Sequence, residues 1–152
     1  MYRMRYNCDA ESYAQQHVLT CNRRQTRPRA LGGFKENVNV LDRKDTTLEG
    51  AVQWAMYTWS SQLTNRGVPS NMIYSREVAD RPISNGVSAF TKMAWSSNTQ
   101  LGCAVNDCGS FFFTSCIYGP GGGNNIGQSI YPIGAVCSQC TANCTDGLCP
   151  TP

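Results

Sequence analysis

The spacing of apolar residues first predicts a helix near the start of the chain. From Asp9 to about Cys21, apolar or weakly polar side chains recur at steps of three and four residues, which places them on one stripe of a helix. Either Asn7 or Asp9 has a side chain suited to capping its first turn. The stripe consists of Ala10, Tyr13, Ala14, His17, Val18 and Cys21. We expect His17, the one histidine of the chain, to pack on a half-buried face without a catalytic partner.

A second helix is predicted between Thr46 and Gly67. Thr46 and Glu49 have the spacing of a capping box, in which each side chain bonds a backbone N–H of the other residue. The helix is expected to end at Asn65-Arg66-Gly67, because glycine readily adopts the left-handed closing conformation. Its predicted buried stripe is Leu48, Val52, Ala55, Met56, Trp59 and Leu63.

Strand patterns follow and precede this second helix. Residues 36–41 alternate, with Val38 and Val40 on one face, and predict a short strand. Residues 68–85 show no period and contain Pro69 and Pro82, so we expect a long surface loop. The ranges 89–95, 101–105 and 111–118 then predict three strands, joined by turn-forming residues. Together these elements indicate an α+β fold.

Composition narrows the class of protein. The 152 residues suit one domain, and no run of about 18 apolar residues is present to span a membrane. The formal net charge of +3 is too small to indicate nucleic-acid binding. We interpret the segment with four arginines as a solvated basic loop: Arg23, Arg24, Arg27 and Arg29. The alternative is that this loop binds anionic lipid or a heparin-like polymer.

The nine cysteines point to an oxidising compartment. A zinc ribbon is the alternative, and it needs two Cys-x-x-Cys pairs separated by a dozen or more residues. The chain has one such pair, Cys137 and Cys140, followed closely by Cys144 and Cys149. Disulfides are therefore favoured over zinc. An odd number of cysteines leaves one thiol without a partner.

Four blocks of the chain, taken in order, resemble the CAP superfamily of cysteine-rich secretory proteins, venom allergens and pathogenesis-related proteins. Ala89-Phe-Thr-Lys-Met-Ala-Trp95 is similar to the family's His-Phe/Tyr-Thr-Gln-Met-Val-Trp strand. Leu101-Gly-Cys-Ala-Val105 with Cys108 is similar to its next strand. Cys116-Ile-Tyr-Gly-Pro-Gly121, through Gly127 and Ile130-Tyr131, resembles its glycine-rich signature, so the glycine run is interpreted as a structural loop. Met1-x-x-Met4-x-Tyr6-x-Cys8 resembles an internal segment of the family.

The resemblance is strongest to the nematode branch, the Ancylostoma-secreted or venom-allergen-like proteins. It implies an α-β-α sandwich with a three-stranded antiparallel core sheet. Residues 1–134 would form a CAP domain lacking its N-terminal helix, and residues 135–152 a cysteine-rich hinge. A preceding segment with a signal peptide and a partner cysteine for Cys8 is expected. Without that helix, a further interpretation is that the fragment does not fold alone.

The same resemblance implies four disulfides. They are Cys21–Cys108 and Cys103–Cys116 in the domain, and Cys137–Cys144 and Cys140–Cys149 in the tail. Asn143-Cys144-Thr145 is formally a glycosylation sequon, although its middle residue is expected in a bridge.

Many CAP domains carry a metal-binding tetrad of two histidines and two acids, which this chain matches poorly. Glu36 corresponds to the first acid, Gln62 replaces the second, and Ala89 replaces the second histidine. The resemblance places the first histidine in the absent helix. We therefore expect no metal, no cofactor and no enzymatic activity, with Glu36 bonded to neighbouring backbone or simply solvated.

Binding remains as the expected function. The resemblance implies a secreted protein that binds an unidentified host or extracellular protein, with immunomodulatory or anti-adhesive action. The alternative is a carrier of sterol or fatty acid, for which Leu31, Phe34, Ile73 and Tyr74 are the candidate contacts.

Overall fold

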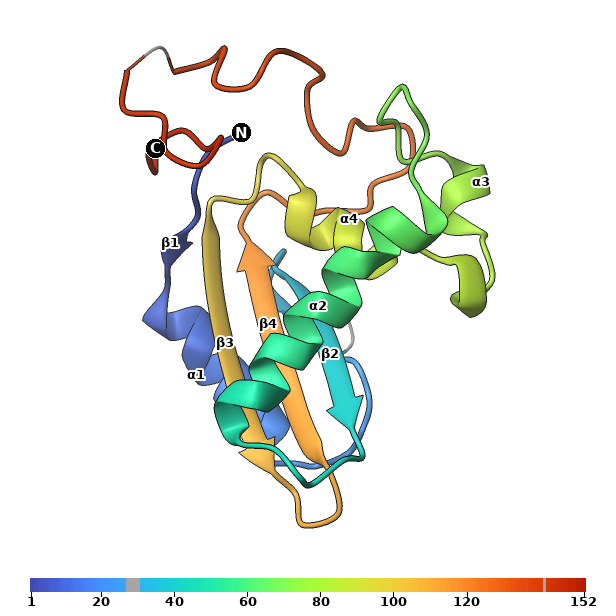
Figure 1. The fold of residues 1–152 in the computed structure, drawn as a ribbon, viewed down its shortest axis with the longest axis vertical. Coiled ribbons are helices and arrows are strands. Elements are labelled where there is room, and N and C mark those ends of the chain that lie inside the picture. Colours follow the sequence, from blue (N-terminus) through green and yellow to red (C-terminus); the bar gives the residue numbers. More distant parts are fainter. Residues whose placement is uncertain (27–30, 141) are drawn as a thin grey trace.

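The computed structural model describes residues 1–26, 31–140 and 142–152 as three layers (Figure 1). A four-stranded mixed sheet has the order β1-β3-β4-β2. The strands are β1 (Arg5–Tyr6), β2 (Lys35–Leu41), β3 (Gln100–Asp107) and β4 (Phe112–Gly119). Strands β2, β4 and β3 are antiparallel and form the core, and the two-residue β1 adds in parallel to β3. The α+β sandwich implied by the resemblance is confirmed.

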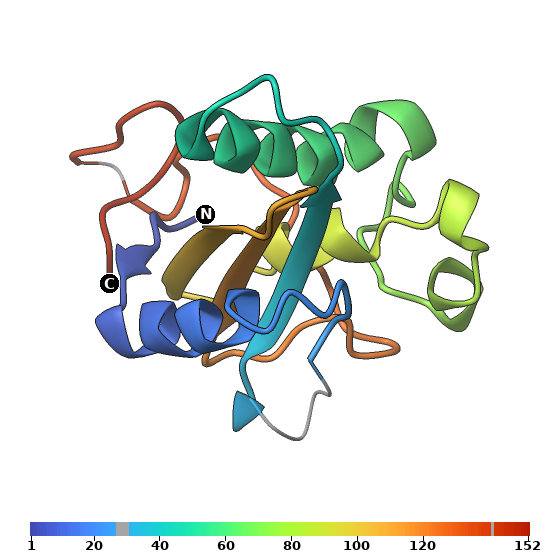
Figure 2. The ribbon, with the colours of Figure 1, turned by 90° about the horizontal axis from the view of Figure 1, so that it is seen from below.

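Helices cover both faces of the sheet. Helix α1 (Cys8–Val18) packs on one face against β3 and β4, and α2 (Leu48–Arg66) lies across the other (Figure 2). Helix α4 (Ser88–Ala94) packs beside α2. Gly102 lets α1 approach β3 closely, because a Cβ at this position would lie 2.2 Å from the backbone nitrogen of Glu11.

Both long helices begin close to their expected positions. Asn7 caps α1 by accepting a hydrogen bond from the N–H of Ala10 at 2.9 Å. Helix α2 is capped by Thr47, whose hydroxyl accepts from the N–H of Gly50, so the capping box expected from Thr46 is wrong by one residue. Gly67 ends α2 with a φ of 73° and an extended ψ of 157°, so it has the positive φ but not the left-handed helical conformation that we expected.

The buried stripe of α2 is narrower than expected. Ala51, Ala55 and Trp59 are buried, but Leu48 and Leu63 are exposed. The reason is that a single helix on a narrow sheet buries only the residues pointing directly at the strands.

Two further expectations about secondary structure are wrong. Residues 89–95 belong to α4 and the turn after it, and they do not form a strand. Within the expected loop at 68–85 lie α3 (Arg76–Ala79) and the 3-10 helix η2 (Ile83–Asn85), with Tyr74 and Val78 buried. Short apolar segments fit either period, so their tertiary contacts decide the structure that forms.

The C-terminal tail returns to the start of the chain (Figure 1). The N–H of Cys149 donates to the carbonyl oxygen of Met1, and the N–H of Arg3 donates to that of Cys149, both at 2.8 Å. None of the described helices combines the length and apolar character needed to cross a membrane.

Candidate functional site

A buried carboxylate lies at the centre of the molecule. Glu36, on β2, is 1% exposed. Its Oε2 lies 2.6 Å from Nδ1 of His17 and accepts a hydrogen bond from Oγ of Ser115 at 2.7 Å. The N–H of Thr26 donates to Oε1 at 2.7 Å. Helix α1, strand β4 and the loop after α1 therefore converge on this one side chain.

The expectation that Glu36 bonds only to neighbouring backbone or is solvated is wrong. Its carboxylate is buried against the imidazole of His17, whose side chain is 10% exposed. The sequence contained a signal for this contact, because alternation along β2 puts Glu36 on the same face as Val38 and Val40, the face covered by α1. His17 lies on the stripe of α1 that packs on that face.

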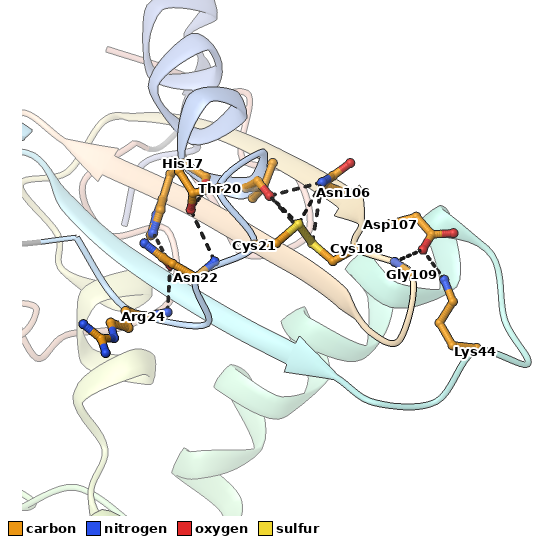
Figure 3. The surroundings of a disulfide bond; sticks show 11 residues. His17, Thr20, Cys21, Asn22, Arg24, Lys44, Asn106, Asp107, Cys108 and Gly109 are labelled. Atoms are coloured by element: carbon orange, nitrogen blue, oxygen red, sulfur yellow. Dashed lines mark hydrogen bonds and ion pairs between the residues drawn. A yellow bond between two sulfur atoms is a disulfide. The ribbon is translucent and has the colours of Figure 1, made fainter.

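Loop residues fix the other side of the imidazole. Nε2 of His17 lies 3.2 Å from Oδ1 of Asn22, and Asn22 accepts a hydrogen bond from the N–H of Arg24 at 2.9 Å (Figure 3). The ring also packs edge-on against Phe113, with centroids 5.2 Å apart. His17 is thus oriented by contacts at both nitrogens.

The backbone of Glu36 is bonded as well. Nε2 of Gln25 donates to its carbonyl oxygen at 2.6 Å, and Nζ of Lys92 donates to the same atom at 2.7 Å. Burial lowers the pKa of Lys92 to about 8, while the charge of Glu36 opposes this shift and that of Lys35 adds to it. Sequence reasoning missed Gln25 and Lys92, because no periodicity or motif relates them to β2.

The other two tetrad positions join α2 to α4. Oε1 of Gln62 accepts hydrogen bonds from the N–H groups of Ala89 at 3.1 Å and Phe90 at 2.9 Å. The carbonyl oxygen of Ala89 accepts from Nδ2 of Asn37 at 2.8 Å. These two positions therefore make structural hydrogen bonds.

This arrangement does not match a nucleophile–base–acid relay. In such a relay the nucleophile and the acid contact opposite nitrogens of one imidazole. Here the hydroxyl of Thr26 and the carboxylate of Glu36 both contact Nδ1 of His17. Ser115 is buried and donates to Glu36 instead of to the histidine.

The residues present do not fit a zinc ion either. Zinc needs about four converging nitrogen, sulfur or oxygen ligands, and neither Ala89 nor the amide of Gln62, whose oxygen is already bonded, supplies one. In the described part of the chain, one group of three ligand atoms lies within 4.8 Å, the sulfur atoms of Cys137, Cys140 and Cys144. All three cysteines are in disulfides.

The structure contains four disulfides, and they are the pairs implied by the family resemblance: Cys21–Cys108, Cys103–Cys116, Cys137–Cys144 and Cys140–Cys149. The first joins the segment after α1 to the turn between β3 and β4, and Asn106, near the end of β3, donates to the carbonyl oxygen of Val18 (Figure 3). In the described chain Cys8 is a free, exposed thiol. Asn143, beside the bridged Cys144, is exposed.

The remaining candidate residues do not gather at one place. Leu31 and Phe34 pack against the cluster under α1, whereas Tyr74 is buried in a separate cluster with Trp95. Ile73 is half-buried in the segment before α3. Arg23 and Arg24 are exposed, and Arg27 and Arg29 lie outside the described residues.

Comparisons with known proteins agree on one family. The profile of CAP, the cysteine-rich secretory protein family, matches residues 1–118. Ancylostoma secreted protein of Ancylostoma caninum is 33% identical over the whole chain, which covers 36% of that protein. Hookworm platelet inhibitor 1 of the same organism is 30% identical over 93% of the chain, which covers 61% of that protein. The chain thus spans about a third to three fifths of these relatives.

Solved structures show the same likeness. The crystal structure of NaASP2 with Zn2+ superimposes with a TM-score of 0.87 at 31% identity, covering 98% of this chain and 76% of that chain. The crystal structure of hookworm platelet inhibitor gives a TM-score of 0.66 at 27% identity, covering 92% of this chain and 66% of that one.

Proposed function

Because the chain belongs to the CAP family of cysteine-rich secretory proteins, we propose that it is a secreted, non-catalytic protein that binds a host or other extracellular protein. The observation that carries this proposal is the state of the central site. The carboxylate of Glu36 is buried and fully bonded, and positions 62 and 89 bond to each other. The described groups around this carboxylate are bonded to one another, so we assign the binding role to the outer surface.

That surface carries aromatic side chains suited to binding another protein. Trp54 and Tyr57 lie on the outer side of α2, 48% and 60% exposed, with ring centroids 5.6 Å apart. Exposed tryptophan and tyrosine are typical anchors of protein interfaces, because they bury a large area at a small entropic cost. A relative named for inhibiting platelets makes a blood-cell or plasma protein a suitable first partner to test.

The test compares surface variants in a functional assay. The oxidised full chain is added to platelets and leukocytes, and the adhesion of these cells is measured. In a parallel assay the immobilised chain is incubated with plasma, and the proteins that the chain retains are identified. We expect inhibition that the double variant Trp54→Ser/Tyr57→Ser loses. Tyr13→Ser is the matched control, since Tyr13 is 59% exposed on α1, across the sheet. If the chain inhibits neither cell type and retains no plasma or membrane protein, the proposal fails.

The alternative function, transport of a sterol or fatty acid, has weaker support. Leu31 and Phe34 pack in one apolar cluster and Tyr74 in another, so these candidate contacts do not gather in one place. Titration with a fluorescent sterol and a fluorescent fatty acid separates the two functions. A saturable signal with either probe would favour transport over protein binding.

A further inference from the structure

A small pocket lies between the C-terminal end of α2 and the start of α4, and Glu36 is not among its described lining residues. Its volume is about 160 Å³, enough for several water molecules or one small ion. Helix α3 and the segment leading to α4 complete its walls. Its polar lining residues are Gln62, Arg66, Tyr74, Arg81 and Ser88.

Two arginines of this pocket form no ion pair with an acidic side chain of the described residues. Nη1 of Arg66 donates to the carbonyl oxygens of Ile83 at 3.0 Å and Gly86 at 2.6 Å, and Nη1 of Arg81 donates to that of Gly67 at 2.7 Å. These bonds hold each guanidinium in place but leave further N–H donors on both groups. Among the described residues, the four ion pairs all lie elsewhere. The acids nearest in sequence, Glu77 and Asp80, are exposed.

The other polar groups of the pocket also present donors. Two backbone N–H groups donate to one atom of the Gln62 amide, so that atom is the oxygen and the NH₂ group is the unused end. The hydroxyl of Tyr74, which also lines the pocket, can donate a hydrogen bond as well. Burial, and secondarily the charge of Asp80, raise the pKa of Tyr74, so its hydroxyl keeps a proton to donate.

The unused hydrogen-bond donors and the positive charges of this pocket favour a negatively charged ligand. Three of the acceptors around the pocket are already bonded, namely Oε1 of Gln62 and the carbonyl oxygens of Ile83 and Gly86. Two positive charges and several N–H and O–H donors remain. We propose that this pocket binds a phosphate- or sulfate-type oxyanion, held between Arg66 and Arg81 and contacted by the amide of Gln62. Guanidinium groups suit such ligands, because their planar fork matches two oxygens at once.

The experiment titrates the oxidised full chain with inorganic phosphate at low ionic strength. The readouts are the backbone amide signals of Gly86, Ala89 and Phe90 and the side-chain N–H signals of Arg66 and Arg81 in nuclear magnetic resonance spectra. We expect saturable shifts confined to these groups. Parallel titrations with sulfate and acetate distinguish a tetrahedral oxyanion from a carboxylate.

Matched variants locate the binding site. Arg81→Gln is expected to weaken phosphate binding by at least about tenfold. Gln62→Glu can still accept from Ala89 and Phe90 but adds a negative charge to the pocket, so it should weaken binding similarly while the fold is retained. Arg76→Gln, at an exposed arginine of α3 outside the pocket, should change affinity by less than about twofold.

Each other outcome would overturn the proposal. Linear, unsaturated shifts would show that the pocket holds only water. Equal phosphate affinity of Gln62→Glu and the unsubstituted chain would place any bound phosphate outside this pocket. This result would overturn the proposal even if Arg81→Gln did not fold and could not be measured. Binding of acetate alone would exclude the tetrahedral class of ligand.

Discussion

At the scale of single residues, Glu36 has the largest share of the specific contacts. It receives hydrogen bonds from His17, Thr26 and Ser115 while it is 1% exposed. A carboxylate in such a position is stable only because each oxygen has a donor. Its role in this chain is therefore to join α1, β4 and the loop after α1 to β2.

Replacing this carboxylate by an amide should destabilise the fold strongly. Glu36→Gln keeps the size of the side chain but removes the buried carboxylate that contacts His17, Thr26 and Ser115, and it puts an NH₂ group where an oxygen accepted hydrogen bonds. We expect the free energy of unfolding in urea at neutral pH to fall by about 3 kcal/mol or more. Glu77→Gln, at an exposed position, should change it by less than about 0.5 kcal/mol. A loss below about 1 kcal/mol for Glu36→Gln would contradict this account.

Lys92 should give the protein a distinct pH dependence. Its pKa is lowered from 10.5 to about 8 in the folded state, mainly by burial. Between these two pKa values the amine of Lys92 is protonated in the unfolded chain and largely neutral in the folded one, so the free energy of unfolding rises with pH through this window. Below about pH 8 the amine is protonated in both states, so the contribution of Lys92 to stability is at its lowest and no longer changes with pH. Stability should increase by about 2 kcal/mol between about pH 8 and about pH 10 relative to Lys92→Gln.

The comparison with Lys92→Gln isolates the contribution of Lys92. Any other group that titrates between about pH 8 and about pH 10 contributes to both proteins and cancels in the difference. If the two unfolding free energies change in parallel with pH, Lys92 is not desolvated as the structure indicates.

At the scale of elements, the segment 89–95 shows where sequence patterns stop being informative. Seven residues of mixed character fit a strand or two turns of helix. The helix forms because Gln62, on α2, accepts hydrogen bonds from the N–H groups of Ala89 and Phe90, and because Lys92 reaches back to β2. Both contacts are distant in sequence. By contrast, α1 and α2 are long enough for their own periodicity and caps to predict them.

The outer edge of β2 is protected by side chains. The carbonyl oxygen of Glu36 accepts from Gln25 and Lys92, and that of Val38 accepts from Nε1 of Trp59 at 3.2 Å. An exposed edge strand with free carbonyl groups invites pairing with another chain. These side chains therefore keep the sheet from extending through β2.

The disulfides should differ in their effect on stability according to the length of chain that they close. Cys21–Cys108 spans 87 residues, whereas Cys140–Cys149 spans 9. Closing the longer loop restricts the unfolded chain more, so Cys21→Ala/Cys108→Ala should cost about 4 to 5 kcal/mol and Cys140→Ala/Cys149→Ala about 2 to 3 kcal/mol. Equilibrium unfolding of both double variants tests this order, and the reverse order would contradict it.

At the scale of the whole molecule, the family resemblance predicted the fold class and the layers. The strand expected at 89–95 was wrong both in the local pattern and in the resemblance, because these residues lie mainly in α4. Two sets of contacts at the buried centre were not predicted from the sequence. One is the set of hydrogen bonds to the carboxylate of Glu36, and the other is the pair of bonds from Gln25 and Lys92 to its carbonyl oxygen. Those contacts depend on how α1 and α4 meet β2, which a single sequence does not state.

The cysteine inventory of the native protein is directly measurable. Four disulfides and one exposed thiol at Cys8 predict that iodoacetamide adds to one site per molecule without denaturant. Intact-mass measurement before and after reduction counts both kinds of cysteine. Cys8→Ser should remove the label completely. More than one label on the native, unsubstituted chain would show that a disulfide is open.

The pairing of the first residues with Cys149 has a mechanical consequence. Because Met1 and Arg3 are hydrogen-bonded to Cys149, the two ends of the described chain lie side by side. A force that pulls these ends apart would load this short pairing before it reaches the central strands. A short linker could join the same ends, so the chain is a suitable candidate for circular permutation with new ends in an exposed loop.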